Sequence, residues 1–207
     1  MHETDAPFEL PLFPLQSVLF PGGLLRLKVF EARYLDLVGL CLREQRPFGV
    51  VALTQGGEVR GHGSEGVAFE SIGCVADVLD VDSEQPGILM VRCRGGRRFH
   101  TVTVEQQPDG LWVSRSNWLP DDESMPPGDA LAGSVEGLRN AIASLQQKGA
   151  LPFLEPYRFD DAGWLANRWC EILPISLAAK QKLMELPDPQ VRLKLVDDFL
   201  RSKGVVG

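Results

Sequence analysis

Leu10-Pro11-Leu12-Phe13-Pro14-Leu15 is an apolar run interrupted by two prolines, and it opens the most informative part of the sequence, residues 10–34. A strand interior rarely accepts two prolines, because proline cannot donate to the ladder, so the run predicts an edge strand or an extended lead-in. Residues 20–23, Phe-Pro-Gly-Gly, predict a turn, since proline presets φ and glycine accepts positive φ. Residues 25–29 alternate apolar and basic side chains, the period of a half-buried strand, and from Phe30 on the period becomes helical.

The chain up to residue 119 has the pattern of a β-barrel with one inserted helix. The helix is expected over residues 31–45, with Leu35, Val38 and Leu42 on its inward face. Strand-like runs follow at residues 48–53, 68–81, 88–93, 97–105 and 111–118. Glycine and proline turns separate them, including a tight turn expected at Gly95-Gly96. Several short strands with such turns are typical of a small closed or nearly closed barrel.

Beyond residue 119 the composition changes. Residues 120–128 are acidic, contain prolines and have few strand formers, which predicts a linker. Apolar spacing of three and four residues then predicts helices at residues 131–145, 160–173, 176–186 and 189–203. Ser176 and Asp188 are placed to cap the last two. The final helix is expected to turn Val191, Leu195 and Phe199 inward, with Leu200 as a further candidate. The sequence thus predicts an α+β fold with a β-domain at 1–119, a linker at 120–128 and a helical bundle at 129–207.

Composition excludes several classes of function. A net charge of −7, from 21 basic and 28 acidic side chains, argues against a protein that binds duplex nucleic acid. The four cysteines form no C-x-x-C motif, and the histidines lie near no cysteine pair, so we expect buried reduced thiols and no metal site. The first twenty residues have no signal-peptide pattern, and no apolar run approaches transmembrane length, so a cytoplasmic protein is expected. We also expect a monomer or weak dimer.

The opening block, with its L-P-L-F-P-L run, V-L-F-P-G turn and F-E-x-R-Y helix start, resembles the amino-terminal substrate-binding domain of Lon proteases. Further matches to the family pattern lie at residues 48–51, 72–78, 95–99, 173–175 and 180–185. The resemblance implies a PUA-like β-pseudobarrel with one inserted helix, followed by a C-terminal helical bundle. It also implies recognition of unfolded or tagged polypeptide, with a protease in trans as a further partner.

No catalytic motif accompanies this resemblance. The chain has no G-x-x-x-x-G-K-[ST] loop to cradle a triphosphate and no evident activated nucleophile, whereas Lon proteases carry a P-loop ATPase and a serine–lysine protease domain. Ser202 and Lys203 are merely adjacent on an expected helix, where neighbouring side chains point apart. We therefore expect a stand-alone, non-enzymatic module without cofactor or metal.

The candidate binding residues are Phe20, Arg33, Tyr34, Arg97 and Arg98. Arg33 and Tyr34 belong to the family signature, and their alternative role is to hold the helix against the barrel. Arg97 and Arg98 belong to a basic cluster with Arg92 and Arg94, which would contact phosphates or form a solvated hairpin tip.

A literal G-x-G-x-x-G occurs at residues 61–66. The dinucleotide fingerprint needs a strand before it and a helix after it, whereas a β-like segment follows here, so we interpret the motif as a flexible hairpin loop.

The expected function is capture of polypeptide, by β-augmentation at an open barrel edge or in an apolar groove between barrel and helices. Two alternatives remain open at this point. One is an RNA- or nucleotide-binding PUA-like module, which the net charge opposes. The other is an unrecognised small-molecule function in an interdomain cleft, which no catalytic motif supports.

Overall fold

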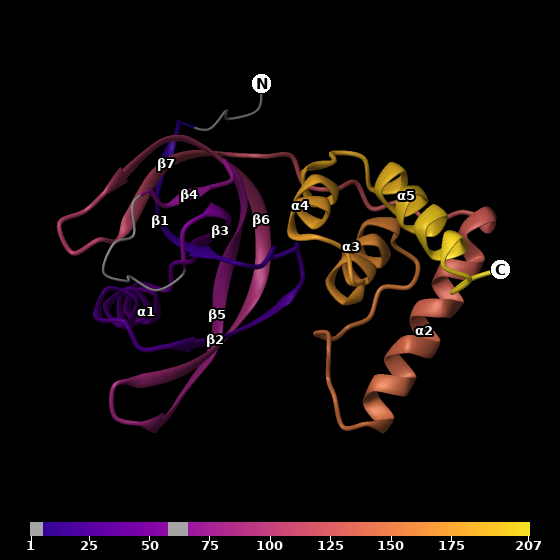
Figure 1. Ribbon diagram of the computed structural model, residues 1–207, viewed down its shortest axis with the longest axis horizontal. Helices are drawn as coiled ribbons and strands as arrows, with labels where there is room; N and C mark the ends of the chain where they lie inside the picture. Colours follow the sequence, from indigo (N-terminus) through magenta and orange to yellow (C-terminus); the bar gives the residue numbers. More distant parts are fainter. Residues whose placement is uncertain (1–5, 58–65) are drawn as a thin grey trace. The chain divides into compact units, whose positions relative to one another are not determined.

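The computed structural model describes residues 6–57 and 66–207 and contains two compact units, which divide between Pro120 and Asp121. All strands and the first α-helix belong to the first unit, and the remaining helices belong to the second (Figure 1). Most of the G-x-G-x-x-G motif, residues 61–65, lies outside the described residues, as does His2.

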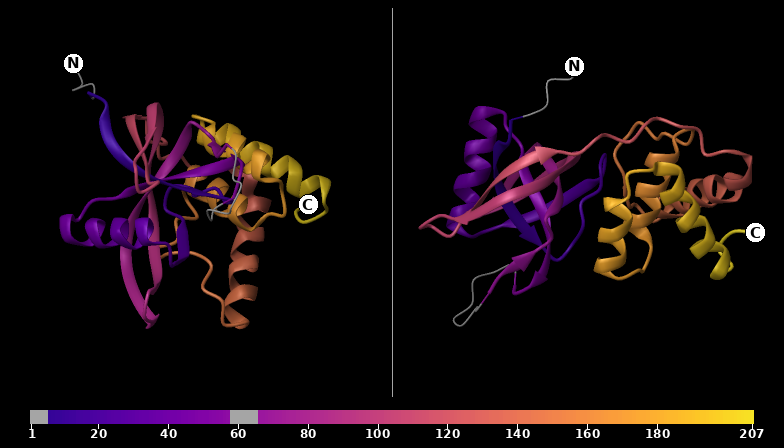
Figure 2. Two further views of the ribbon diagram at one scale, coloured as in Figure 1. Left: turned by 60° about the vertical axis from the view of Figure 1, so that its left-hand side comes forward. Right: turned by 90° about the horizontal axis from the view of Figure 1, so that it is seen from above.

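The first unit is a mixed sheet with one helix. Its elements are β1 (Phe8–Leu15), β2 (Leu24–Val29), α1 (Ala32–Glu44), β3 (Phe48–Gln55), β4 (Ala68–Phe69), β5 (Ile72–Gln85), β6 (Ile88–Gln106) and β7 (Trp112–Trp118). The strands pair in the order β1-β7-β6-β5-β3, and a parallel pairing of β1 with β3 closes this path into a ring. β4 joins β3, whereas β2 lies off the ring on β6. The long β5–β6 hairpin extends beyond the other strands (Figures 1 and 2).

β1 is not the edge strand that its prolines predict. Its first half, up to Leu12, pairs antiparallel with β7, and its second half, from Leu12 on, pairs parallel with β3. Pro11 belongs to the first ladder and Pro14 to the second, so each proline borders only one paired strand. Proline is tolerated wherever one flank of a strand is unpaired. In β1 the unpaired flank lies on one side in the first half and on the other side in the second half, so both prolines fit although β1 is not an edge strand.

Gly95-Gly96 does not form a turn either. Both glycines lie inside the uninterrupted strand β6, and the ladder to β5 shifts register there, with a bulge opposite Val75. A Cβ on Gly95 would lie 2.1 Å from the carbonyl oxygen of Phe20. Gly22 N–H donates to Gly95 O at 2.7 Å, so the glycine permits two backbones to approach closely. The predicted turn is wrong because glycine pairs mark close approach as well as chain reversal.

Two hydrophobic clusters fill the unit, one on each face of the strands. The larger cluster includes the α1 side chains Tyr34, Leu37, Val38 and Cys41. The second gathers Leu10, Leu12, Val51, Val75 and Phe99. Leu42, which we expected to face inward, is exposed, because the stacking of Tyr34 on Phe13 at 3.8 Å turns the neighbouring helix face to the core.

The second unit is helical. After a 3₁₀ turn η1 (Asp129–Leu131) come α2 (Ala132–Gln147), α3 (Ala162–Ile172), α4 (Leu177–Glu185) and α5 (Pro189–Ser202). The predicted caps are confirmed: Ser176 Oγ accepts from Ala179 N–H at 3.1 Å, and Asp188 accepts from the N–H groups of Gln190 and Val191. In the part of the chain that the structure describes, no helix combines the length and apolarity needed to cross a bilayer.

The inward face of α5 differs in part from the expected one. Leu200 is buried, as the prediction allowed, but Val191 and Leu195 are 47% and 48% exposed, and Leu193 and Val196 are buried instead. Arg192 and Asp197 are buried with them. The prediction is wrong because the stripe was chosen from apolar spacing, and spacing does not reveal that charged side chains occupy the inward face.

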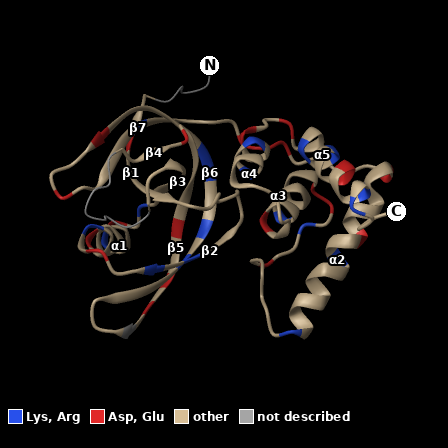
Figure 3. Cartoon of the chain, viewed as in Figure 1, with Lys and Arg blue, Asp and Glu red and all other residues tan. Residues whose placement is uncertain are grey.

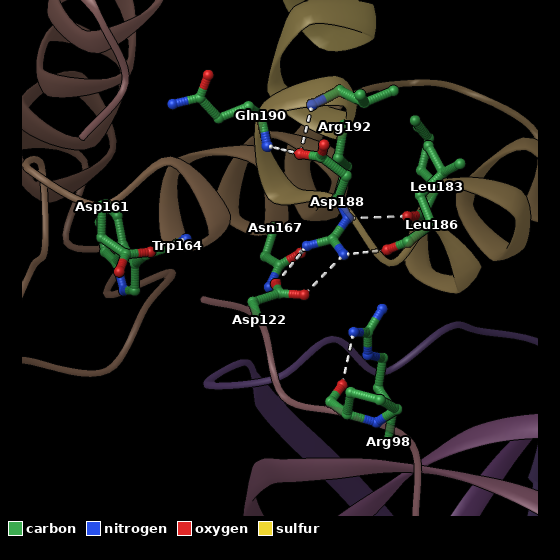
Figure 4. Close-up of polar contacts among 12 residues, drawn as sticks. Arg98, Asp122, Asp161, Trp164, Asn167, Leu183, Leu186, Asp188, Gln190 and Arg192 are labelled. Atoms are coloured by element: carbon green, nitrogen blue, oxygen red, sulfur yellow. Dashed lines mark hydrogen bonds and ion pairs between the residues drawn. The ribbon is translucent and has the colours of Figure 1, made fainter. Parts of the chain in front are cut away.

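Residues 122–126, which we expected in a linker, are bound to the helical unit. Asp122 accepts two hydrogen bonds from Arg192, at 2.6 and 3.1 Å (Figure 4). Ala162 N–H donates to Met125 O at 2.8 Å, and Gln190 Nε2 donates to Pro126 O at 3.0 Å. The segment lacks regular secondary structure, but its contacts assign it to the second unit.

Candidate functional site

The strand β2 lies at an open edge of the sheet. It pairs with β6 from Leu24 opposite Arg94 to Val29 opposite Leu89, and within residues 6–57 and 66–207 no other strand pairs with it. A groove of about 300 Å³ runs beside it, which we call the β2 groove. Its lining residues are Phe13, Leu15, Ser17, Leu25, Arg26, Leu27, Lys28, Val29, Phe30, Glu31 and Tyr34.

The β2 backbone directs hydrogen-bonding groups toward this open side. Gly95 N–H donates to Gly23 O at 2.8 Å, immediately before β2 begins. Successive residues of a strand direct their backbone groups to alternate flanks, so the groups of Leu25 and Leu27 face β6. The N–H and C=O of Leu24 and Lys28 consequently face the open side.

One side of the β2 groove is apolar. Leu27 and Val29 are buried on the inner face of β2, and Tyr34 stacks on Phe13 behind them. Phe30, at the end of the strand, is 50% exposed. A large aromatic ring exposed beside an unpaired strand offers an apolar contact to an incoming chain.

The signature residues Glu31, Arg33 and Tyr34 form a polar support at the start of α1. Arg33 forms an ion pair with Glu31 at 2.9 Å and donates to Gly110 O at 2.8 Å. Its guanidinium lies 4.5 Å from the centre of the Tyr34 ring. These contacts hold α1 against the sheet, as the structural alternative for these residues predicts. Tyr34 also lines the β2 groove.

The outer face of the same strands is charged. Arg26 and Lys28 of β2 are exposed, and Arg26 lies opposite Arg92 of β6. Arg92 in turn forms an ion pair with Asp80 of β5 at 2.7 Å. Figure 3 shows basic segments on β2 and β6 and an acidic segment on β5. The acidic side chains of β5 therefore lie two strands away from the open edge, whereas Glu31, which follows β2 and lines the groove, is paired with Arg33.

Asp77 belongs to the same face, opposite Arg94. Its pKa is raised by partial burial, and the charge of Arg94 opposes that rise.

The other predicted binding residues lie elsewhere. Phe20 is fully buried, with its carbonyl against Gly95. The Arg97 guanidinium lies 4.8 Å from the Trp118 ring centre, and Arg98, only 4% exposed, donates to Pro120 O at 3.0 Å. The structure thus brings Tyr34 to the groove, with Arg33 close behind it. Without a turn at Gly95-Gly96 the arginines form no hairpin tip and instead lie along β6.

Sequence reasoning missed the importance of Lys28 and Phe30. The alternation of apolar and basic residues correctly predicts the half-buried strand β2. It cannot show which flank of that strand has a partner, because the paired residues of β6 lie 60 to 70 positions away.

The cysteines offer no reactive group at this site. All four are buried and free, as the sequence predicts. Burial raises the pKa of Cys41 to about 11 and that of Cys93 to about 12, so neither thiol ionises near neutral pH. In the described portion of the chain no three His, Cys, Asp or Glu side chains gather in a way that could hold a metal ion.

Comparison with known proteins agrees with this architecture. The model of the ATP-dependent protease La (LON) substrate-binding domain matches residues 9–202. Among curated relatives, Lon protease 2 of Myxococcus xanthus is 24% identical over 98% of this chain, which spans 24% of that relative. Cereblon of Xenopus tropicalis is 26% identical over 58% of this chain, which spans 26% of that relative.

Solved structures extend the comparison. A Lon N-terminal domain protein from Xanthomonas campestris superposes with a TM-score of 0.71 at 30% identity, covering 91% of this chain and 96% of its own. The N-terminal domain of a Mycobacterium avium complex Lon protease gives a TM-score of 0.61 at 18% identity, covering 94% and 98%. The chain therefore corresponds to nearly a whole isolated domain and to about a quarter of the matched curated relatives.

Proposed function

The chain belongs to the LON substrate-binding domain family, and we propose that it is a non-catalytic module that captures unfolded polypeptide by adding an extended segment to the open edge of β2. The proposed partner is a protease in trans that receives the captured chain. We also propose that the first unit is a PUA-like pseudobarrel and that the protein is a cytoplasmic monomer or weak dimer.

The observation that carries the proposal is that β2 pairs with β6 and with no other strand among the described residues, beside a groove with an apolar side. Backbone hydrogen bonds to an added strand depend little on side-chain identity, which suits a protein that must accept many unfolded sequences. The exposed Phe30 ring and the partly buried Leu25 provide apolar contacts for alternate side chains of the added segment.

Hydrogen exchange tests this mode of binding in the unaltered protein. On addition of a labelled, permanently unfolded polypeptide, the amide of Lys28 should become protected, because it would donate to the added strand. Amides of α5 should keep their exchange rates. Binding without protection anywhere along β2 would contradict the proposal.

A pair of variants at one position separates backbone from side chain. Lys28→Pro removes the outward N–H and should weaken binding of the unfolded polypeptide at least tenfold, whereas Lys28→Ala keeps the N–H, loses only the exposed side-chain charge and should weaken binding far less. Circular dichroism verifies that both variants stay folded.

Leu195→Ala is the control on a second exposed apolar surface. A groove of about 610 Å³ in the helical unit is lined by Leu131, Val191 and Leu195 among others. If Leu195→Ala abolishes binding and Lys28→Pro does not, the polypeptide binds to the helical unit. Tight binding of labelled RNA that collapses with rising salt, without peptide binding, would favour the nucleic-acid alternative.

A further inference from the structure

We propose that the segment captured at β2 alternates apolar residues with aspartate or glutamate. This inference rests on the proposed function and specifies its ligand: an extended acidic-amphipathic segment, apolar on the face of β2 that carries Leu25, Leu27 and Val29 and acidic on the face that carries Arg26 and Lys28.

The first observation is the order of charges across the outer face of three neighbouring strands. Asp77 and Asp80 of β5 lie opposite Arg94 and Arg92 of β6, and Arg92 lies opposite Arg26 of β2. From β5 outward, an acidic strand is thus followed by a basic strand and then by a second strand with basic residues. A further strand with acidic residues would place carboxylates beside the basic residues of β2, as β5 does beside those of β6.

The second observation is the position of Lys28 relative to the acids. Lys28 lies opposite Met90, which lies opposite Asp82. Neighbouring strands are about 4.8 Å apart, so Asp82 is on the order of 10 Å from Lys28, close to the screening length at physiological salt. A carboxylate on an added strand would lie directly beside Lys28 instead.

The third observation is the apolar character of the other β2 face. Leu25, Leu27 and Val29 alternate with the basic residues and face the cluster that contains Tyr34. Successive side chains of an added strand point to opposite faces, so a segment that satisfies both faces of β2 must alternate apolar and acidic residues. The overall charge of −7 does not oppose this, because exposed charges act mainly over about one screening length.

The expected effect is moderate. Each exposed cross-strand charge pair contributes modestly to binding, and replacing an attractive pair by a repulsive one changes the affinity twice as much as removing the pair. With Arg26 and Lys28 both facing the added strand, an acidic segment should bind about tenfold more tightly than the same segment with basic residues.

The experiment uses three labelled peptides of equal length in which valine alternates with glutamate, glutamine or lysine. Fluorescence anisotropy with the full chain should rank glutamate above glutamine above lysine. The advantage of the glutamate peptide should shrink as salt rises. The double variant Arg26→Glu, Lys28→Glu should reverse the ranking.

The matched control is Lys182→Glu, Lys194→Glu, which makes the same change in net charge on exposed side chains of the helical unit. It should leave the ranking unchanged. A reversal in this control would mean that net charge alone sets the preference, which would overturn the inference.

Two further outcomes separate the inference from the proposed function. If all three peptides bind equally and protect the Lys28 amide, the charge preference is refuted and capture at β2 stands. If no peptide protects β2, the proposed function itself fails. A glutamate preference that survives the charge reversal at β2 would place the acidic contact elsewhere and refute the inference.

Discussion

Arg192 is a buried cation whose five N–H groups all meet acceptors. The side chain is 1% exposed and donates to Asp122, Asn167 and the carbonyls of Leu183 and Leu186 (Figure 4). A buried charge is tolerated only when it is paired and its remaining donors are satisfied. Arg192 therefore joins the irregular segment around Asp122 to α3 and to the α4–α5 connection.

Glu171 should titrate far from the usual range of glutamate. Burial raises its pKa from 4.5 to about 7, against the opposing charges of Arg168 and Lys180. The folded chain thus keeps this proton up to about pH 7, whereas the unfolded chain releases it near pH 4.5. The stability contributed by this proton is fully present below pH 4.5 and is lost as pH rises through 7.

NMR titration of the Glu171 side-chain carboxyl carbon measures this pKa directly, with a midpoint expected near pH 7. Glu171→Gln is the matched variant. Between pH 5 and 7 the free energy of unfolding of the parent should fall because its unfolded chain releases the Glu171 proton, and that of Glu171→Gln should fall less. A midpoint close to 4.5 would show that the ion pair with Arg168, at 2.5 Å, fully offsets the effect of burial on the pKa.

Among the elements, β6 shows how one strand can serve several contacts. Residues 89–94 lie between β5 and β2, residues 99–100 lie between β5 and β7, and the pairing with β7 continues to Gln106. The bulge at Gly95 and Gly96 separates the part beside β2 from the part beside β7, where the chain of Phe20 approaches the strand. The pairing of β2 with β6 begins directly beside this bulge. The position of the open edge of β2 therefore depends on the bulge.

Gly95→Ala should destabilise the first unit by about 3 kcal/mol, because the new methyl group would lie 2.1 Å from a backbone oxygen. Gly39→Ala in α1 is the control: its methyl group would meet only the movable end of Arg43, at 3.3 Å. The gain in helix propensity should make that variant as stable as the parent or more stable, by about 0.5–1 kcal/mol. Urea unfolding measures both, and equal stability of the two variants would refute the close-approach explanation.

At the scale of the whole molecule, the segment between the two units should resist proteolysis despite its composition. Asp122 anchors it to Arg192, and Ser124 donates to Asp161 at 2.8 Å. Asp122→Ala would leave Arg192 buried without its carboxylate, which should lower the free energy of unfolding of the helical unit by about 3 kcal/mol. The freed segment should then be cut first by subtilisin.

Glu123→Ala changes an exposed neighbour of Asp122 and should alter neither stability nor cleavage. Rapid cleavage of the parent chain within residues 119–129 would show instead that the linker prediction is correct.

Local patterns were sufficient for the family, for most helices and strands and for the caps at Ser176 and Asp188. Periodicity, turn chemistry and capping depend on residues a few positions apart, so a single sequence carries them fully. The same holds for the alternating strand β2 and for the buried state of the four cysteines. The PUA-like class, the domain limits and the role of the predicted binding residues stay predictions.

The features that define the candidate site arise from contacts between distant parts of the chain. The unpaired flank of β2 depends on β6, the role of Gly95 depends on Phe20, and the anchored segment depends on a contact between Asp122 and Arg192, 70 positions apart. The inward face of α5 likewise depends on partners for its buried charges. No local pattern encodes which distant strand or side chain fills a position, because that choice follows from the packing and hydrogen bonding of the folded chain as a whole.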